Sequence, residues 1–279
     1  IIATRPHQNV STGRALRAIA AITWTMLVFA CAAAVSGATL QRYYSDPAAA
    51  RDDYRGIVHF ILATAQPNDA IVLAAPGQSE VFDYYYHGDL PVHALPQQRP
   101  LDLEQTTAQL QGLLAYDKIY AVFWALEEAD PMGVIEGWLN RWGYKTLDQW
   151  HGNVRLVVYE MPERHAPDET VGDFDVEFES SQGDGITLAG YRGWNLAPSA
   201  GEVTQAQLVW RSAATPARRY KVFLQLLDPR NQVIAQRDAE PGGDGRPTTS
   251  WQPGEIVTDN HGLFIPPGTP PGSYRRIVG

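Results

Sequence analysis

The sequence predicts one N-terminal transmembrane helix, then an α/β domain with a three-layer, mainly parallel sheet, and then an antiparallel β-sandwich domain. Three observations predict this order. Residues 18–40 carry no charged side chain, residues 46–163 alternate helical and strand patterns, and residues 174–279 follow a period of two in short runs between turn residues. These patterns are typical of a membrane span, of a parallel sheet covered by helices, and of a sandwich, respectively.

The uncharged run at residues 18–40 would form a helix about 34 Å long, enough to cross a hydrocarbon core of about 30 Å. The charges before it are all basic: Arg5, Arg14 and Arg17. This asymmetry predicts a cytoplasmic flank at residues 1–17 and an extracytoplasmic location for everything after residue 40. A cleaved signal peptide ending near Ala38 and a lipid anchor at Cys31 remain alternatives, and both give the same location.

Because the chain begins with Ile1 and ends at Gly279 inside a predicted strand, we expect it to be a fragment of a longer protein. Residues 1–40 carry a charge of +3, residues 41–163 of −9 and residues 164–279 of −3, which gives the net charge of −9, and no basic patch interrupts the acidic part. This distribution predicts no nucleic-acid partner. The one cysteine cannot form an intrachain disulfide, so core packing has to stabilise both domains.

The α/β domain is predicted at residues 41–163. Asp46-Pro47 is typical of a helix start, and apolar residues at helical spacing then continue to Ala65. The fully apolar run 70–74 predicts a strand buried on both faces. The remaining elements are predicted as helices at 79–86, 103–114 and 131–142 and as strands at 119–124, 144–147 and 154–159.

The polar, proline-containing stretch 164–173 predicts a linker to the sandwich domain at 174–279, which we expect to be truncated at its C-terminus. Its strands are predicted around 174–178, 186–191, 206–210, 220–227, 233–236 and 274–278. In the segment Trp251-Gln252-Pro253-Gly254, the proline and glycine predict a turn. Trp251 is interpreted as an apolar plug at one end of the sandwich, with a sugar-stacking platform as the alternative.

No motif predicts a catalytic centre. The sequence contains no nucleophile elbow, no phosphate-binding loop and no zinc-binding helix motif. His87 and His93 with Asp83 and Asp89 are interpreted as polar loop residues, not as a metal site, and the glycine-rich segments 183–185 and 242–245 as turns. We therefore expect no catalytic residue, no metal and no cofactor. The acidic group Glu127, Glu128 and Asp130 is interpreted as complementing a helix dipole.

The tyrosine cluster Tyr84, Tyr85 and Tyr86, followed by His87, is the candidate site for sugar or acceptor contact. Three consecutive tyrosines on a helix cannot all face one core, so at least one should be exposed. A tyrosine ring has an apolar face and a polar tip, which suits sugar stacking in an extracytoplasmic protein. The structural alternative is that two rings pack on the sheet and the third covers the helix end.

Several spaced residues also carry a resemblance: Tyr44, Asp46-Pro47, Asp53 to Arg55, Ile57, Asp69, Ile71 to Leu73, Tyr84 to Tyr86 and Phe123-Trp124. With the segments 222–228, 247–255 and 270–275 of the second domain, they resemble the C-terminal region of bacterial GT-C class membrane glycosyltransferases, the protein-mannosyltransferase-like and aminoarabinose-transferase-like enzymes. The β-sandwich resembles a domain appended to some of these enzymes.

The resemblance implies that the parent protein transfers a sugar from a polyprenyl-phosphate donor to an extracytoplasmic acceptor. The family's acidic catalytic loops would lie upstream of Ile1, so no catalytic residue can be placed on this sequence. We therefore predict the non-catalytic C-terminal portion of an integral membrane glycosyltransferase, located in the cell membrane. Its predicted partners are the lipid bilayer, a polyprenyl-linked sugar, and a glycan or protein acceptor.

Two other functions follow from the residues themselves. One is a membrane-anchored extracytoplasmic module that binds glycan or protein through the sandwich. The other is a secreted α/β hydrolase-like enzyme, which the missing nucleophile elbow disfavours.

Overall fold

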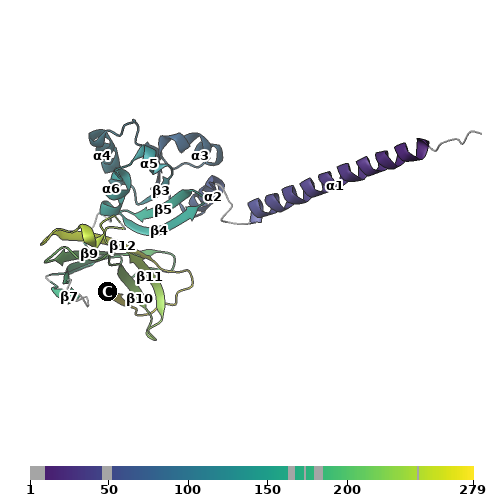
Figure 1. Ribbon diagram of the computed structural model, residues 1–279. Helices are drawn as coiled ribbons and strands as arrows, with labels where there is room; N and C mark the ends of the chain where they lie inside the picture. Colours follow the sequence, from purple (N-terminus) through teal and green to yellow (C-terminus); the bar gives the residue numbers. More distant parts are fainter. Residues whose placement is uncertain (1–9, 46–51, 163–166, 173, 179–184, 244) are drawn as a thin grey trace, which may run out of the picture. The chain divides into compact units, whose positions relative to one another are not determined.

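The computed structural model describes residues 10–45, 52–162, 167–172, 174–178, 185–243 and 245–279 (Figure 1). The chain forms two compact units, residues 1–51 and residues 52–279. The first unit contains the helix α1 (Val10–Ser45).

The predicted transmembrane helix at residues 18–40 is wrong. A membrane span must be both long and apolar enough, and no helix in the described part of the chain meets both requirements. Residues 18–40 instead form part of the longer helix α1. The helix start predicted at Asp46-Pro47 lies outside the described residues.

The second unit begins with helices and strands in the predicted alternation (Figure 1). They are α2 (Tyr54–Thr64), β1 (Ala70–Ala74), α3 (Ser79–Tyr85), β2 (Val92–Leu95), α4 (Leu103–Gly112), β3 (Lys118–Phe123), α5 (Leu126–Ala129), α6 (Val134–Trp142), β4 (Tyr144–His151) and β5 (Val154–Glu160). Helix α2 starts where the Asp53 carboxylate accepts a hydrogen bond from the Gly56 N–H at 2.9 Å, which satisfies one of the open donors of the first turn.

The rest of the second unit consists of strands. They are β6 (Glu169–Val171), β7 (Val176–Phe178), β8 (Ile186–Trp194), β9 (Val203–Ser212), β10 (Val222–Leu227), β11 (Val233–Ala239), β12 (Ile256–Phe264) and β13 (Arg275–Val278). Strand β12, which the sequence does not predict, lies between the two groups of strands.

The sheets differ from the predicted mainly parallel sheet beside a separate sandwich. One mixed sheet of ten strands runs in the order β2-β1-β3-β5-β4-β12-β9-β8-β6, with β7 also paired to β8, and a second sheet has the order β11-β10-β13. Strands β2, β1 and β3 are parallel, whereas β5 runs antiparallel to both β3 and β4. The fold-class prediction is therefore corrected to a mixed sheet that is continuous through both parts.

This continuity depends on β12, which pairs in parallel with β4 at His261 and Lys145 and along its length with the antiparallel strand β9. The predicted domain boundaries 41–163, 164–173 and 174–279 stay predictions. Residues 163–166 and 173 of the predicted linker region lie outside the described residues.

The cores follow from the alternation of side chains along the strands. In β1, Val72 points into one buried cluster with residues of α4 and α6, while Ile71 and Leu73 point into another with residues of α2. Figure 1 shows helices over both faces of this part of the sheet. In the β part, side chains of β8, β9 and β12 pack against those of β10, so the two sheets enclose a core in the manner of a sandwich.

A buried polar seam joins β12 and the glycine loop before it to α6 and β4. The side-chain amide of Asn260 donates to the carbonyl oxygens of Arg141 and Gly143, at 3.0 and 3.3 Å. In the opposite direction, the carbonyl of Gly243 accepts from the Asn140 amide at 3.1 Å and from the Lys145 ammonium at 2.9 Å. Because buried polar groups are costly unless they are paired, this seam fixes one arrangement of the two parts.

Candidate functional site

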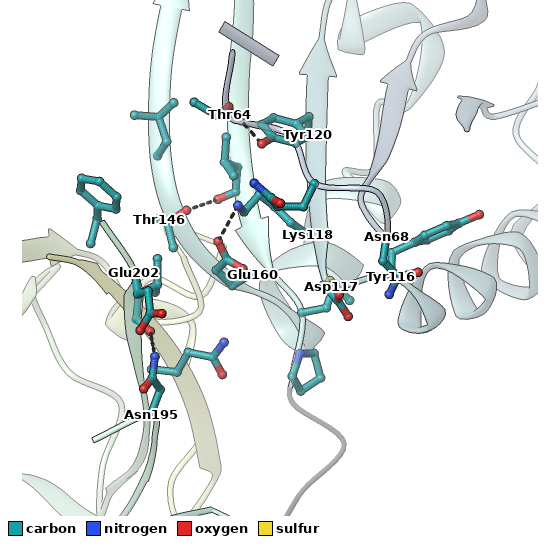
Figure 2. A pocket seen from close by; sticks show the side chains of 18 of the residues that line it. Thr64, Asn68, Tyr116, Asp117, Lys118, Tyr120, Thr146, Glu160, Asn195 and Glu202 are labelled. Carbon is teal, nitrogen blue, oxygen red and sulfur yellow. Dashed lines mark hydrogen bonds and ion pairs between the residues drawn. The ribbon is translucent and has the colours of Figure 1, made fainter. Parts of the chain in front are cut away.

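A cavity of about 1210 Å³ in the second unit lies where the two parts of the ten-stranded sheet meet (Figure 2). Its wall comes from segments far apart in sequence: the end of α2 and the turn after it, the segment leading into β3, the end of β5, the turn between β8 and β9, and the end of β12. Sites between structural parts are common for small ligands.

Aromatic rings form part of this wall. Phe60, Tyr116, Tyr120 and Phe264 all line the cavity, and Phe264 keeps 46% of its surface exposed. The Tyr120 ring is held by an edge-on contact with Phe60 and by a hydrogen bond between its hydroxyl and that of Thr64, at 3.0 Å. Two of the rings are thus fixed in place before any ligand binds.

Tyr116 is held by a residue of β2. Its hydroxyl lies 3.2 Å from His93 Nε2, and the two rings are 5.6 Å apart. Burial lowers the pKa of His93, since an imidazolium is poorly solvated there. The neutral imidazole is therefore the form that holds Tyr116 near pH 7.

An ion pair crosses the cavity wall between the neighbouring strands β3 and β5. Lys118 and Glu160 are register partners, and Lys118 Nζ lies 3.3 Å from a Glu160 carboxylate oxygen (Figure 2). Burial raises the pKa of Glu160, an effect that Lys118 partly offsets. For Lys118, burial acts to lower the pKa, but the charge of Glu160 and its hydrogen bond, together with Tyr120 and Asp69, outweigh burial, and the net shift is upward. The ammonium therefore stays charged and compensates the carboxylate.

Polar groups of the β8–β9 turn form the facing wall. The Asn195 amide donates to the Val203 carbonyl at 2.9 Å, and the Glu202 carboxylate accepts from the Ser199 N–H at 2.8 Å. The next polar residue, Gln205 on β9, is only 5% exposed and also lines the cavity. Its Oε1 atom has no hydrogen-bond partner within the described residues. Such orphaned buried acceptors are rare in folded proteins.

The chemistry of this wall suits binding better than catalysis. Glu160, whose pKa burial raises, is held by Lys118. A histidine–aspartate pair does exist elsewhere, with His261 Nε2 at 2.7 Å from Asp259, but both residues are buried at 0–1% exposure. Asp259 also accepts from the Gly242 N–H and the Trp210 indole, so this pair belongs to the core.

The tyrosine cluster predicted from the sequence lies outside this cavity. Tyr84 is 74% exposed and Tyr85 is 38% exposed, with their rings edge to face at 4.9 Å. Tyr86 is buried, stacks on Phe82 and accepts a hydrogen bond from the Leu90 N–H. His87 is exposed. As expected, at least one ring is exposed. Their role in sugar contact stays a prediction.

Two smaller sequence interpretations can be compared with the structure. No group of three or more metal-binding side chains gathers within the described residues, His87 and His93 included. The Asp130 carboxylate accepts hydrogen bonds from the N–H groups of Val134 and Ile135, at 2.9 and 2.7 Å. This confirms its predicted role at a helix N-terminus.

Comparison with family models, with curated proteins and with solved structures finds no match to this chain. The resemblance to glycosyltransferases therefore stays a prediction.

Proposed function

We propose that this chain is a glycan-binding module and that the glycan binds in the cavity between the two parts of the ten-stranded sheet. The observation that carries the proposal is the composition of the cavity wall, in which ordered aromatic rings alternate with fixed amides, hydroxyls and carboxylates. A sugar presents apolar C–H faces and hydroxyls that both donate and accept hydrogen bonds. Both features have counterparts on this wall.

A binding role is also supported by what the polar groups already contact. A general acid or base must be free to exchange a proton with its substrate. Glu160 is paired with Lys118, and His261 is buried in strand β12. The remaining carboxylates of the wall, Asp117 and Glu202, are exposed to solvent.

Phe264→Ala is expected to weaken glycan binding by about tenfold, equivalent to about 1.4 kcal/mol. The ring lies at the cavity edge with 46% of its surface exposed, so its removal should cost little stability. The measurement is retention of the labelled chain on an array of immobilised glycans, followed by titration of the glycans that are retained.

Tyr84→Ala is the matched control, because Tyr84 is an exposed aromatic residue that is far from Phe264 in sequence and does not line the cavity. It should bind glycan as the unmodified chain does. If Tyr84→Ala loses binding while Phe264→Ala keeps it, glycan binds at the tyrosine cluster and the cavity assignment is wrong. Retention of no glycan at all would refute the proposed function.

The chain is expected to neither transfer sugar from a polyprenyl-phosphate donor nor hydrolyse an oligosaccharide. The reason is that, among the described residues of the wall, Glu160 is paired with Lys118 and no nucleophile lies beside a free base. Incubation with a radiolabelled lipid-linked sugar and a glycan acceptor measures transfer, and a chain-free sample gives the background. Label in the acceptor above that background would contradict this expectation.

A non-catalytic glycan-binding module is compatible with the role predicted from the sequence as part of a glycosyltransferase. That role, the polyprenyl-linked sugar as a partner and the extracytoplasmic location stay predictions. A free glycan ligand would be met most readily outside the cytoplasm, which is why we retain the location as part of the proposal.

A further inference from the structure

We infer that the cavity binds an extended oligosaccharide, with the two ends of the cavity contacting different sugar rings of one ligand. The inference rests on the proposed glycan-binding function and specifies the size class of the glycan. It combines two observations: the width of the cavity floor, and the presence of an aromatic ring together with an amide at each end of it.

The floor of the cavity is one face of the ten-stranded sheet. Lining residues come from β3, β5, β4, β12 and β9, which are consecutive neighbours in that sheet. Within β3 the lining residues Lys118 and Tyr120 are two positions apart, as are Val158 and Glu160 within β5, so each pair points to one face. Because neighbouring strands lie about 4.8 Å apart, the four spacings between β3 and β9 give a floor about 19 Å wide.

The cavity is also too large for a single sugar ring. Its volume of about 1210 Å³ exceeds the range of roughly 300–1,000 Å³ that is typical of pockets enclosing a whole drug-sized molecule. A monosaccharide is smaller than such a molecule and would leave most of the wall in contact with water. A chain of linked rings would cover the wall from one end to the other.

One end of the cavity, at β3, combines the ring of Tyr116 with the amide of Asn68 (Figure 2). The Asn68 carbonyl accepts a hydrogen bond from the Asp117 N–H at 3.0 Å, and His93 holds the Tyr116 hydroxyl at 3.2 Å. Tyr116 is half-buried and Asn68 is exposed. A fixed ring and a neighbouring amide are therefore both within reach of a ligand at this end.

The other end has the same combination, made by residues from a different part of the chain. Phe264 of β12 is the register partner of Val203, and the carbonyl of Val203 accepts the hydrogen bond from the Asn195 amide. Strand β12 is three spacings from β3, or about 14 Å. Since this is far more than one sugar ring covers, Tyr116 and Phe264 would contact different rings of the same ligand.

Between the two ends the floor is polar and partly accessible. The side chains of the ion pair Lys118–Glu160 keep 20% and 19% of their surface exposed. On the next strand, the Thr146 hydroxyl donates to the Val158 carbonyl at 3.2 Å. Sugar hydroxyls both donate and accept hydrogen bonds, so a glycan that reaches both ends would pass over groups that suit it.

The test measures affinity against ligand length by isothermal titration calorimetry of the full chain. The probes are β-1,4-linked glucose and β-1,4-linked N-acetylglucosamine, each from the methyl glycoside to the hexasaccharide. In at least one series the affinity should rise more than about tenfold from the methyl glycoside to the tetrasaccharide, because contact at the second end becomes intramolecular. The affinity should then level off once the ligand is longer than the cavity.

Phe264→Ala and Tyr116→Ala identify the two ends. Each should weaken binding of the tetrasaccharide by about tenfold, whereas the methyl glycoside, which reaches only one end, should respond to at most one of the two changes. Trp150→Ala is the matched control. Trp150 is an exposed aromatic residue of β4 that does not line the cavity, so its removal should leave the dependence on length unchanged.

The outcomes separate this inference from the function beneath it. If the affinity rises only in proportion to the number of rings, or if only one of the two variants weakens the tetrasaccharide, the cavity holds a single ring and the inference is overturned while glycan binding stands. If no member of either series binds, the inference is also overturned, and the glycan array then decides whether the proposed function fails with it. The length series needs no variant, so it decides the question even if Tyr116→Ala does not fold.

Discussion

Replacing Trp251 with alanine is expected to lower the free energy of unfolding by about 3–5 kcal/mol. The indole is 1% exposed and packs in the sandwich core with Leu188, Leu208 and Trp210. Its N–H donates to the Arg246 carbonyl at 3.1 Å, so truncation leaves both a void and an unpaired acceptor. Trp251 is therefore a buried core residue, as its interpretation as an apolar plug requires.

Chemical denaturation of the purified chain measures this effect. Trp150→Ala is the matched control, since Trp150 keeps 68% of its surface exposed and its truncation leaves no buried void. Its unfolding midpoint should change little. Equal midpoints for the two variants would show that Trp251 does not contribute to the core, and would favour the sugar-platform alternative.

Lys145→Ala is expected to cost a similar amount, about 3–5 kcal/mol, through the loss of charge balance inside the protein. The side chain is 2% exposed, and its ammonium lies 3.4 Å from Glu136, 3.3 Å from Asp148 and 2.9 Å from the Gly243 carbonyl. Without it, Arg155 alone would have to neutralise both carboxylates. The carboxylates of Glu136 and Asp148 and the carbonyl of Gly243 would then share fewer hydrogen-bond donors in a part of the protein that water hardly reaches.

Lys145→Met separates charge from packing, because methionine retains most of the chain's apolar volume. We expect it to be nearly as destabilising as Lys145→Ala, whereas stability close to that of the unmodified chain would assign the effect to packing. The pH dependence gives a second readout. Burial lowers the pKa of Lys145 against the opposing effect of the two carboxylates.

The sign of this pH effect follows from linkage. Between the lowered folded pKa and the unfolded value of about 10.4, the unfolded chain binds more protons than the folded chain. The folded state of the unmodified chain should therefore gain stability relative to Lys145→Met as the pH rises toward 10.4. A constant difference across that range would contradict the burial of this ammonium.

Much of the α/β part could be predicted because its signals are local. The apolar run 70–74 corresponds to β1 residue for residue, and the helical spacing after Tyr54 corresponds to α2. Each pattern reports a buried face that the segment itself carries. The short edge strand β2 was not predicted, since Pro91 precedes it and Pro96 follows it closely.

Strand β12 could not be predicted for a physical reason. Periodicity detects apolar faces, but the middle of β12 buries three polar residues, Asp259, Asn260 and His261. The Asn260 amide finds its partners in Arg141 and Gly143, far away in sequence. Without this strand the two halves look like separate domains. The continuous ten-stranded sheet therefore cannot be predicted from hydrophobic periodicity alone.

The cavity could not be predicted from the sequence for a different reason. Its wall comes from segments between Phe60 and Phe264, and none of them carries a motif. Gln205 is a polar residue of the kind that usually faces outward from a strand, and only the fold reveals that it is buried. The tyrosine cluster, by contrast, is conspicuous because its members are adjacent in sequence. Local patterns thus indicated an exposed aromatic surface and missed a cavity assembled by tertiary structure.

The glycine loop before β12 limits how this protein can evolve. Gly243 adopts φ +64°, and a Cβ atom there would lie 2.6 Å from the Asn140 side-chain oxygen, so both the backbone and the neighbouring helix require glycine. Its carbonyl receives donors from Asn140 and Lys145, about a hundred positions earlier in the chain. A recombination event that exchanged either half for a foreign one would separate acceptor from donors. The two halves should therefore be inherited together, as a single evolutionary unit.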